Sequence, residues 1–211
     1  MTDSQKYLKR GVDILLSLIG IIVTSPILAI GIVLSAISTS SCGLFFQKRV
    51  GRNGKLFLLI KLRTMKFSRY RNTNVTISND PRITIIGKYL RKTKIDELPQ
   101  LFNVLLGTMS FVGPRPDVPG YADLLEGKDR ALLDLRPGIT GPASLYFHNE
   151  EELLTKVTNP EHFNKEIIWP KKVILNLEYL ENYSLFTDFN LIFKTLFIRK
   201  AQLDDLKELS G

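Results

Sequence analysis

The chain has 211 residues, enough for one domain of ordinary size, with a formal net charge of +8, one cysteine and two histidines. A single cysteine excludes an intrachain disulfide, and two histidines argue against a histidine-rich metal site. The charge excess lies entirely in residues 1–66, where ten basic and two acidic residues flank an apolar run, whereas residues 67–211 carry nineteen of each sign. Cations around an apolar segment suit anionic membrane lipid better than nucleic acid, so we expect a lipid partner and no nucleic-acid partner.

The apolar run covers residues 11–37, and Asp13 is its only charged residue. As one helix it would be about 40 Å long, more than the roughly 30 Å of a bilayer core. Ser25 and Pro26 lie near its middle, where proline breaks or kinks a helix and a serine hydroxyl can bond to a freed carbonyl. Each half would then be too short to span a bilayer. Basic residues flank both ends and favour two cytoplasmic ends, so a re-entrant hairpin and a kinked spanning helix are both open.

A β-hairpin is predicted directly after the apolar run. Residues 44–50 and 55–62 have the apolar and β-branched or aromatic content of strands. The segment between them, GRNG at 51–54, is rich in residues that form tight turns. The two strands should therefore pair in an antiparallel fashion.

Two helices are predicted after a polar loop at 67–80. The first covers 81–92, with Asp80 as its N-cap and Pro81 at its first position, where a missing N–H costs nothing. The second covers 96–106 and ends at a glycine, the residue that most often closes a helix.

Two adjacent carboxylates, Asp96 and Glu97, begin the second of these helices. Capping is the simplest explanation, because acidic residues in a first turn satisfy free N–H groups and suit the helix dipole. On this interpretation the Asp96 carboxylate stays ionised at neutral pH and is exposed at the mouth of the helix.

The remaining chain alternates rigid loops with helices, which makes the predicted fold class α+β with a mainly helical domain. Loops rich in proline and glycine are predicted at 113–116 and 136–141, and helices over 117–135, 149–157, 163–183 and 186–208. In the last helix, apolar residues recur at a spacing typical of either a core face or an amphipathic helix at a membrane interface. We expect a membrane anchor over 1–40 and one integrated domain over 41–211.

Five basic residues are candidates for binding phosphate: Lys61, Arg63, Arg91, Arg115 and Arg136. Each alone would be an ordinary surface charge, but arginine in a rigid loop suits bidentate phosphate binding. Gathered near the acidic pair, such cations would neutralise phosphates while the carboxylates hold Mg²⁺ or attack phosphorus. The sequence has no glycine-rich P-loop and no dinucleotide-binding fingerprint.

Three strings follow the apolar run that Ser-Pro interrupts: KLRTM at 61–65, DELPQLFNVLLGTMSFVGPRP at 96–116 and LRPGITGPASL at 135–145. Together they resemble the bacterial sugar transferase family. These are small monotopic phosphoglycosyl transferases, which start glycan assembly on polyprenyl phosphate. The resemblance extends from about residue 5 to residue 198.

The resemblance implies a mechanism and the residues that perform it. Asp96 would attack the β-phosphate of a UDP-sugar, expel UMP and carry the phosphosugar covalently until polyprenyl phosphate accepts it. Glu97 would help to hold Mg²⁺. The loop formed by Pro114, Arg115 and Pro116 would contact the nucleotide.

The resemblance also implies a location at the bacterial inner membrane, with the catalytic domain on the cytoplasmic face. The break in the family's re-entrant helix corresponds to Ser25 and Pro26, which favours the hairpin over a spanning helix. The expected partners are a UDP-sugar, undecaprenyl phosphate and membrane lipid.

The chain departs from the family pattern in two places that concern sugar recognition. Many members have Asn-Gly-Arg after the Gly-Ile-Thr-Gly turn, where this chain has LYFHNEEE at 145–152, and many have Asp-x-Tyr-Tyr where it has NLEY at 176–179. Two other functions are open: a membrane-tethered protein that binds anionic lipid without needing Asp96, and a membrane phosphohydrolase that uses Asp96 with water as acceptor. UMP release that depends on polyprenyl phosphate would separate the three.

Overall fold

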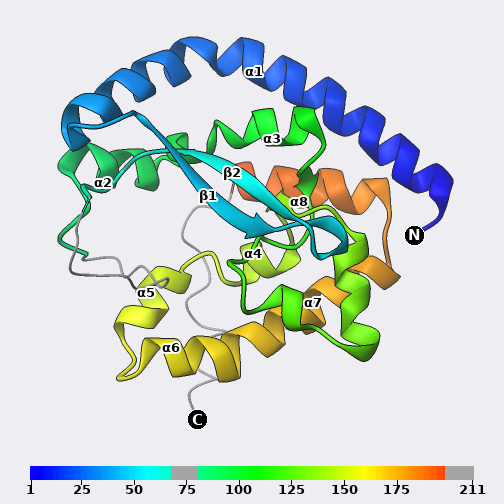
Figure 1. Cartoon of the computed structure of the whole chain (residues 1–211). Coiled ribbons are helices and arrows are strands. Elements are labelled where there is room, and N and C mark those ends of the chain that lie inside the picture. Colours follow the sequence, from blue (N-terminus) through cyan, green and yellow to red (C-terminus); the bar gives the residue numbers. More distant parts are fainter. Residues whose placement is uncertain (68–79, 198–211) are drawn as a thin grey trace.

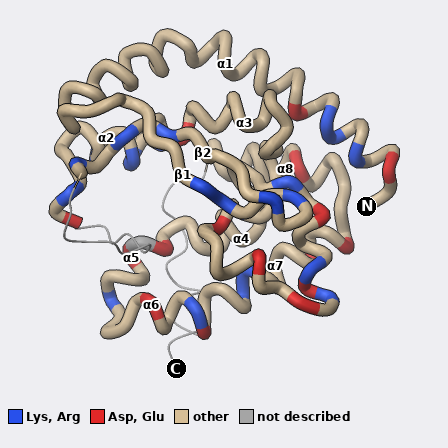
Figure 2. The backbone as a smooth tube through the Cα atoms, in the orientation of Figure 1, with Lys and Arg blue, Asp and Glu red and all other residues tan. Residues whose placement is uncertain are grey.

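The computed structural model describes residues 1–67 and 80–197. The fold is α+β and mainly helical. A long N-terminal helix, α1 (Asp3–Thr39), arches over a two-stranded hairpin and a set of shorter helices (Figure 1). In the described part of the chain, α1 is the one helix whose length and apolar composition would allow it to cross a membrane. Its middle part carries no charged residue (Figure 2).

The expected interruption of α1 at Ser25 and Pro26 is wrong, because α1 is one continuous helix that contains Pro26 and curves along its length (Figure 1). Proline deprives the carbonyl four residues earlier, that of Ile22, of its amide partner. The Ser25 hydroxyl donates to this carbonyl at 2.9 Å, as the sequence suggested. The Thr24 hydroxyl donates to the Gly20 carbonyl at 2.7 Å. The Ser25 hydroxyl thus satisfies the carbonyl that the proline leaves without a donor, and the helix continues through Pro26.

The two sides of α1 differ sharply. On its inner side, small residues let other elements approach: a methyl group at Gly31 would lie 2.8 Å from Leu62 Cδ1, and one at Gly20 would lie 3.2 Å from Leu101 Cδ1. The outer side exposes large apolar side chains, among them Leu15, Ile22, Val23, Ile30 and Ile37. Such a face in water would be costly, which indicates a membrane location.

The predicted hairpin is confirmed. Strands β1 (Leu44–Val50) and β2 (Leu56–Leu62) pair antiparallel. In the turn between them, Asn53 and Gly54 have φ of 58° and 73°, the left-handed region that asparagine and glycine tolerate best.

The next helix, α2 (Ile85–Lys92), is shorter than the predicted 81–92. Its N-cap is Thr84, whose hydroxyl accepts an amide of the first turn. Asp80 instead accepts the N–H of Arg82 at 2.9 Å and closes a local turn, so the prediction of Asp80 as helix cap is wrong.

The helix predicted over 96–106 is divided in two. A 3₁₀ turn (Ile95–Glu97) comes first, and α3 (Gln100–Leu106) follows with Pro99 as its N-cap. Gly107, with φ of 83°, ends α3 as predicted. The acidic pair therefore lies upstream of the α-helix and not in its first turn.

Helix α3 is fixed to the hairpin by one side chain. The Asn103 amide donates to the Leu58 carbonyl at 2.8 Å, and its oxygen accepts the Ile60 N–H at 3.0 Å. The amide thus takes the place of a neighbouring strand at the edge of β2. The acidic turn that precedes α3 is thereby held against β2.

A parallel pair of short strands was not predicted. Strands β3 (Ser110–Val112) and β4 (Gly138–Thr140) bring the loop at 113–116 beside the loop at 136–141. A methyl group at Gly138 would lie 2.2 Å from the Gly113 nitrogen, so this approach requires glycine.

The helix predicted over 117–135 is wrong. That segment contains two 3₁₀ helices, Ala122–Leu124 and Gly127–Asp134. Gly120 and Gly127 have φ of 104° and 56°, which a right-handed helix cannot contain.

The last helices follow the prediction more closely. The described elements are α4 (Pro142–Tyr146), α5 (Glu150–Thr155), α6 (Pro160–Phe163), a π turn (Asn164–Ile168), α7 (Trp169–Glu181) and α8 (Leu185–Phe197). The predicted helix at 149–157 is confirmed by α5, and that at 163–183 by the continuous run from the π turn through α7. Residues 198–208 of the last predicted helix lie outside the described part.

Helix α8 is attached to the start of α1 by a buried polar cluster. Lys9 forms an ion pair with Asp188 at 2.6 Å, and the hydroxyls of Tyr179 and Tyr183 donate to the same carboxylate. The opposite side of α8 exposes aromatic and aliphatic side chains, among them Phe186, Phe189, Phe193, Leu196 and Phe197.

Candidate active site

The acidic pair occupies a tight turn between α2 and α3. Lys94, just before it, has a left-handed backbone with φ of 59°, and the 3₁₀ turn Ile95–Glu97 follows. The carboxyl groups of Asp96 and Glu97 therefore do not cap α3, which has no side-chain cap hydrogen bond.

Glu97 joins three separate elements. Its Oε1 accepts hydrogen bonds from Lys61 of β2 at 3.3 Å and from Arg115 of the Pro-Arg-Pro loop at 2.9 Å. Burial alone would raise the pKa of Glu97, but the charges of Arg115 and Lys61 outweigh it and hold the pKa well below its usual range. Glu97 is therefore ionised at neutral pH.

Asp96 has different surroundings from those expected. Its side chain is buried, with a residue exposure of 8%, and its Oδ1 has no hydrogen-bond partner. Burial and the charge of Glu97 raise the pKa of Asp96 to about 6, against the opposing charges of Lys61, Lys94 and Arg91. The prediction of an exposed carboxylate stabilised by helix N–H groups is wrong, because Asp96 is not in a helix N-terminal turn.

The structure brings some of the five candidate cations together and places others apart. Lys61 and Arg115 contact Glu97, and Arg91 is near enough to lower the pKa of Asp96. Arg63 instead donates to the Cys42 and Leu44 carbonyls at the start of the hairpin.

The fifth candidate cation, Arg136, lies at the other end of α3 from the acidic pair. It donates to the Gly107 carbonyl at 2.9 Å. Arg10 donates to the neighbouring carbonyls of Val104 and Leu105 at 2.6 and 2.8 Å. These two arginines cap the C-terminus of α3, so Arg136 has a structural contact that sequence reasoning could not foresee.

The Pro-Arg-Pro loop is held from two sides. The Pro114 carbonyl accepts the N–H of Gly138 at 2.8 Å, and the Pro116 carbonyl accepts Arg49 at 3.0 Å. The Arg115 side chain between them is 40% exposed, so a ligand can reach it.

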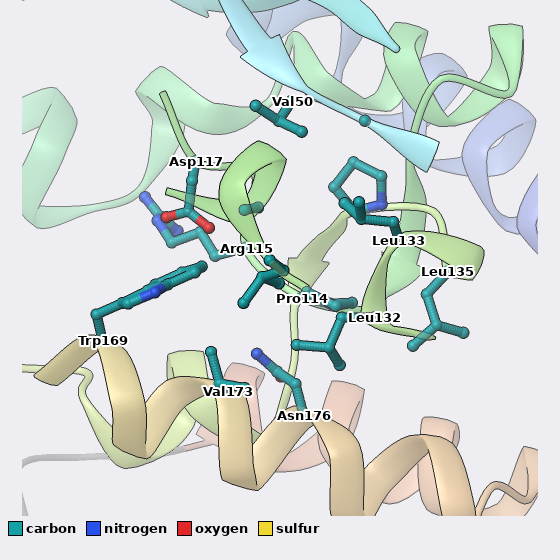
Figure 3. Close-up of a pocket in the computed structure, with 14 residues that line it drawn as sticks. Val50, Pro114, Arg115, Asp117, Leu132, Leu133, Leu135, Trp169, Val173 and Asn176 are labelled. Carbon is teal, nitrogen blue, oxygen red and sulfur yellow. The ribbon is translucent and has the colours of Figure 1, made fainter. Parts of the chain in front are cut away.

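Beneath this loop lies a small cavity of about 30 Å³ lined mainly by apolar side chains. Figure 3 shows Arg115 and Asp117 above the Trp169 ring and the Asn176 amide turned toward the cavity. The cavity has room for about one water molecule, so it is too small to hold a substrate.

Two residues that the sequence analysis did not select lie in this cluster, Arg49 and Asp117. In the sequence, Arg49 is one of the basic residues that flank the apolar run. Burial raises the pKa of Asp117 to about 6, against the charges of Lys172, Arg49 and Arg115. The sequence signal that could have found Arg49 is strand alternation, which puts it on the same face of the hairpin as Lys61.

The free oxygen atoms of Asp96 and Glu97 decide whether this pair could bind Mg²⁺. Among the described residues no three His, Cys, Asp or Glu side chains are grouped as a metal site. Both hydrogen bonds to Glu97 go to Oε1, which leaves Oε2 without one in the described part of the chain, and Asp96 Oδ1 has none. This oxygen-only set fits Mg²⁺, which protein sites often hold through one or two carboxylates together with substrate phosphates and water.

Comparison with known proteins shows the family of the chain. The family model described as bacterial sugar transferase matches residues 4–202. The exopolysaccharide production protein ExoY of Rhizobium meliloti (strain 1021) is 32% identical over 204 residues, which cover 89% of this chain and 83% of that protein.

Two further relatives have names that state a reaction. The UDP-glucose:undecaprenyl-phosphate glucose-1-phosphate transferase of Escherichia coli (strain K12) is 35% identical over 93% of this chain and 41% of its own length. The undecaprenyl-phosphate galactose phosphotransferase of Salmonella typhimurium (strain LT2) is 33% identical over 91% of this chain and 40% of its own length. The chain spans less than half the length of these two relatives.

Proposed function

The chain belongs to the bacterial sugar transferase family, and from that premise we propose that it is a phosphoglycosyl transferase, moving a sugar phosphate from a UDP-sugar to polyprenyl phosphate. UMP is the leaving group, and undecaprenyl phosphate is the expected acceptor. The product would be a polyprenyl-diphosphate sugar that starts the assembly of a surface glycan or exopolysaccharide.

The reaction consists of two displacements at the β-phosphorus of the UDP-sugar. In the first, an Asp96 carboxylate oxygen forms a bond to phosphorus while the bond to the bridging oxygen breaks, and UMP leaves with that electron pair. In the second, a phosphate oxygen of polyprenyl phosphate attacks the same phosphorus. The bond to Asp96 then breaks and the free carboxylate is restored.

The observation that carries this assignment is the state of Asp96. A buried carboxylate oxygen in a native protein normally has a hydrogen-bond partner, and Asp96 Oδ1 has none. The charges of Lys61, Lys94 and Arg91 act on it and would offset its repulsion of an anionic phosphate. If Asp96 served only to stabilise the fold, this oxygen would be expected to accept a hydrogen bond.

The neighbouring side chains divide the remaining work. Arg115, partly exposed and joined to Glu97, would bind phosphate oxygens of the nucleotide. Lys61 would offset the negative charge of the acidic pair and the substrate. Burial lowers the pKa of Lys61, and the charge of Glu97 acts in the opposite direction. Glu97 would hold Mg²⁺ through its second oxygen, and a bound Mg²⁺ would neutralise charge on the diphosphate.

The membrane arrangement follows from the exposed apolar surfaces. The ion pair between Lys9 and Asp188 attaches α8 to the start of α1. The exposed apolar sides of both helices would enter the inner membrane from its cytoplasmic face. On this proposal the curved α1 returns to the side it entered, and α8 lies in the interface. The acidic turn would then be near the level at which a lipid phosphate is available.

The test is UMP release by full-length protein extracted from membranes, with undecaprenyl phosphate and a panel of UDP-sugars. We expect one or a few sugars to give turnover that requires the lipid acceptor. Continuous UMP release without acceptor would indicate a hydrolase, and no release with any UDP-sugar would favour a lipid-binding protein.

A further inference from the structure

The inner face of the hairpin carries a second cation besides Lys61. Because strand side chains alternate between faces, Gln47 and Arg49 of β1 share one face with Leu59 and Lys61 of β2. Lys61 reaches Glu97 from this face. The charge of Arg49 acts on Lys61, so the two cations are directed toward the same region.

The partners of Arg49 are all neutral. Its Nε and one terminal nitrogen donate to Gln47 Oε1 at 3.1 and 2.7 Å, and the other terminal nitrogen donates to the Pro116 carbonyl at 3.0 Å. Within the described chain it forms no ion pair with a carboxylate. These bonds hold the guanidinium rigidly between β1 and the Pro-Arg-Pro loop.

A partly buried guanidinium without a paired anion is costly, because neutral acceptors only partly replace its hydration. Burial and the charge of Arg115 lower the pKa of Arg49 to about 10, and the charges of Asp117 and Glu97 act in the other direction without reaching contact. Lys61 and Arg115 each have Glu97 as a partner in contact. Within the described chain Arg49 has only neutral acceptors in contact, so it is the cation of this group that an added anion can pair with.

We propose that Arg49 binds a phosphate group of the substrate, and that this phosphate belongs to the nucleotide and not to the lipid. The proposal rests on the proposed function, because it assigns a ligand within the same site. Arg49 lies five residues along β1 from the end that joins α1, roughly 17 Å at strand spacing. The hairpin descends from α1 toward its turn (Figure 1). Its open end, at Leu44 and Leu62, packs against Leu28 of α1. Arg49 lies near the opposite end, one residue before β1 ends.

The experiment compares Arg49→Met with Lys48→Met, a change at the adjacent exposed residue on the other face of β1. The full chain is extracted in detergent, and the affinity for UDP and for inorganic diphosphate is measured by calorimetry. Loss of a charge-assisted phosphate contact predicts a ten- to hundredfold weaker affinity for both ligands in Arg49→Met. Lys48→Met should bind like the wild type.

Kinetics distinguish the source of the phosphate. We expect Arg49→Met to raise the KM for the UDP-sugar and to leave the KM for undecaprenyl phosphate unchanged within about twofold. A raised KM for the lipid with unaltered UDP affinity would overturn the assignment to the nucleotide.

A purely structural role for Arg49 has its own signature. In that case Arg49→Met would melt at a lower temperature and bind UDP with wild-type affinity, which would overturn the proposal. If Arg49→Met does not fold, Arg49→Lys keeps the charge but not the fork of donors, and it should bind UDP more weakly than the wild type; unchanged binding would again overturn it. Failure of the wild type to bind UDP or any UDP-sugar would instead count against the proposed function.

Discussion

Asp96 and Glu97 are consecutive residues of one 3₁₀ turn, yet their carboxyl groups have opposite electrostatic surroundings. Arg115 and Lys61 both contact Glu97 and hold its pKa below the usual range, whereas burial and Glu97 itself raise the pKa of Asp96 to about 6. In a 3₁₀ turn, neighbouring side chains point about 120° apart, so the two cannot do the same work. Glu97 organises the cations, and Asp96 keeps an oxygen without a partner.

The topology of α1 can be tested by cysteine labelling. Because basic residues flank both ends of the apolar run, we expect Thr2 and Asn53 to be on the same, cytoplasmic side. The exposed Cys42 is first changed to Ser, and Thr2→Cys and Asn53→Cys are then probed separately in intact cells with a membrane-impermeant reagent. Neither should react from outside.

Labelling of Thr2→Cys from outside would show that α1 spans the membrane. Pro26→Leu provides the matched variant, because it restores a backbone donor and should straighten the helix. We expect it to favour spanning.

The need for Mg²⁺ is the next prediction. Glu97 and substrate phosphates supply hard oxygen ligands, so we expect turnover to require Mg²⁺, with Mn²⁺ as a possible substitute. Excess EDTA should abolish UMP release, and added Mg²⁺ should restore it. Full activity in EDTA would rule out the metal.

How far the sequence leads depends on whether local or distant contacts decide a feature. The hairpin was predictable because the turn residues at 51–54 and the strand patterns are local. The acidic turn was not, because the pattern at 96–106 is that of one helix beginning at Asp96, whereas Pro99 is the N-cap of α3. Lys94 adopts a left-handed backbone instead, and the pair closes a separate turn before α3.

Which residues meet at the site was predictable only in part, because contacts between distant parts of the chain bring them together. Lys61 and Arg115 are 54 positions apart in the chain (115 − 61) and meet only through Glu97. Arg136 was selected for its rigid loop, but the parallel pairing of β3 with β4 carries it to the C-terminus of α3. Strands of three residues between glycines and prolines look like turns, so local patterns cannot reveal this pairing.

The attachment of α8 to α1 gives a stability prediction. Asp188→Asn would leave the buried Lys9 without its counter-ion, and removal of one partner from a buried pair costs about 3–5 kcal/mol. The free energy of unfolding, measured by denaturant titration in detergent, should fall accordingly.

The double variant Lys9→Met with Asp188→Asn should recover part of this loss, because both members of the buried pair are then neutral. Lys6→Met, which breaks the exposed pair with Asp3, serves as the control and should have no measurable effect. Equal losses in the single and double variants would contradict a coupled pair.

Asp117 gives a prediction about pH. Its pKa in the folded protein, about 6, is above the ordinary aspartate value of 3.8, so the folded state binds this proton more tightly than the unfolded state does. The ionised carboxylate therefore destabilises the fold above pH 6, and the penalty disappears as the pH falls through 6 toward 4. Asp117→Asn should raise Tm at pH 7.5 and have little effect near pH 4. A larger effect at pH 4 than at pH 7.5 would contradict the sign.

The most direct test of the mechanism is covalent labelling of Asp96. Full-length protein is incubated with a UDP-sugar labelled in the sugar and without acceptor, and label on the denatured protein is measured. Asp96→Asn keeps the shape of the side chain but removes the anion, so it should fold normally, reach the membrane and lose nearly all turnover. We predict label on the wild type, its release by undecaprenyl phosphate, and none on Asp96→Asn. Label that persists on Asp96→Asn would place the nucleophile at another residue and contradict the account.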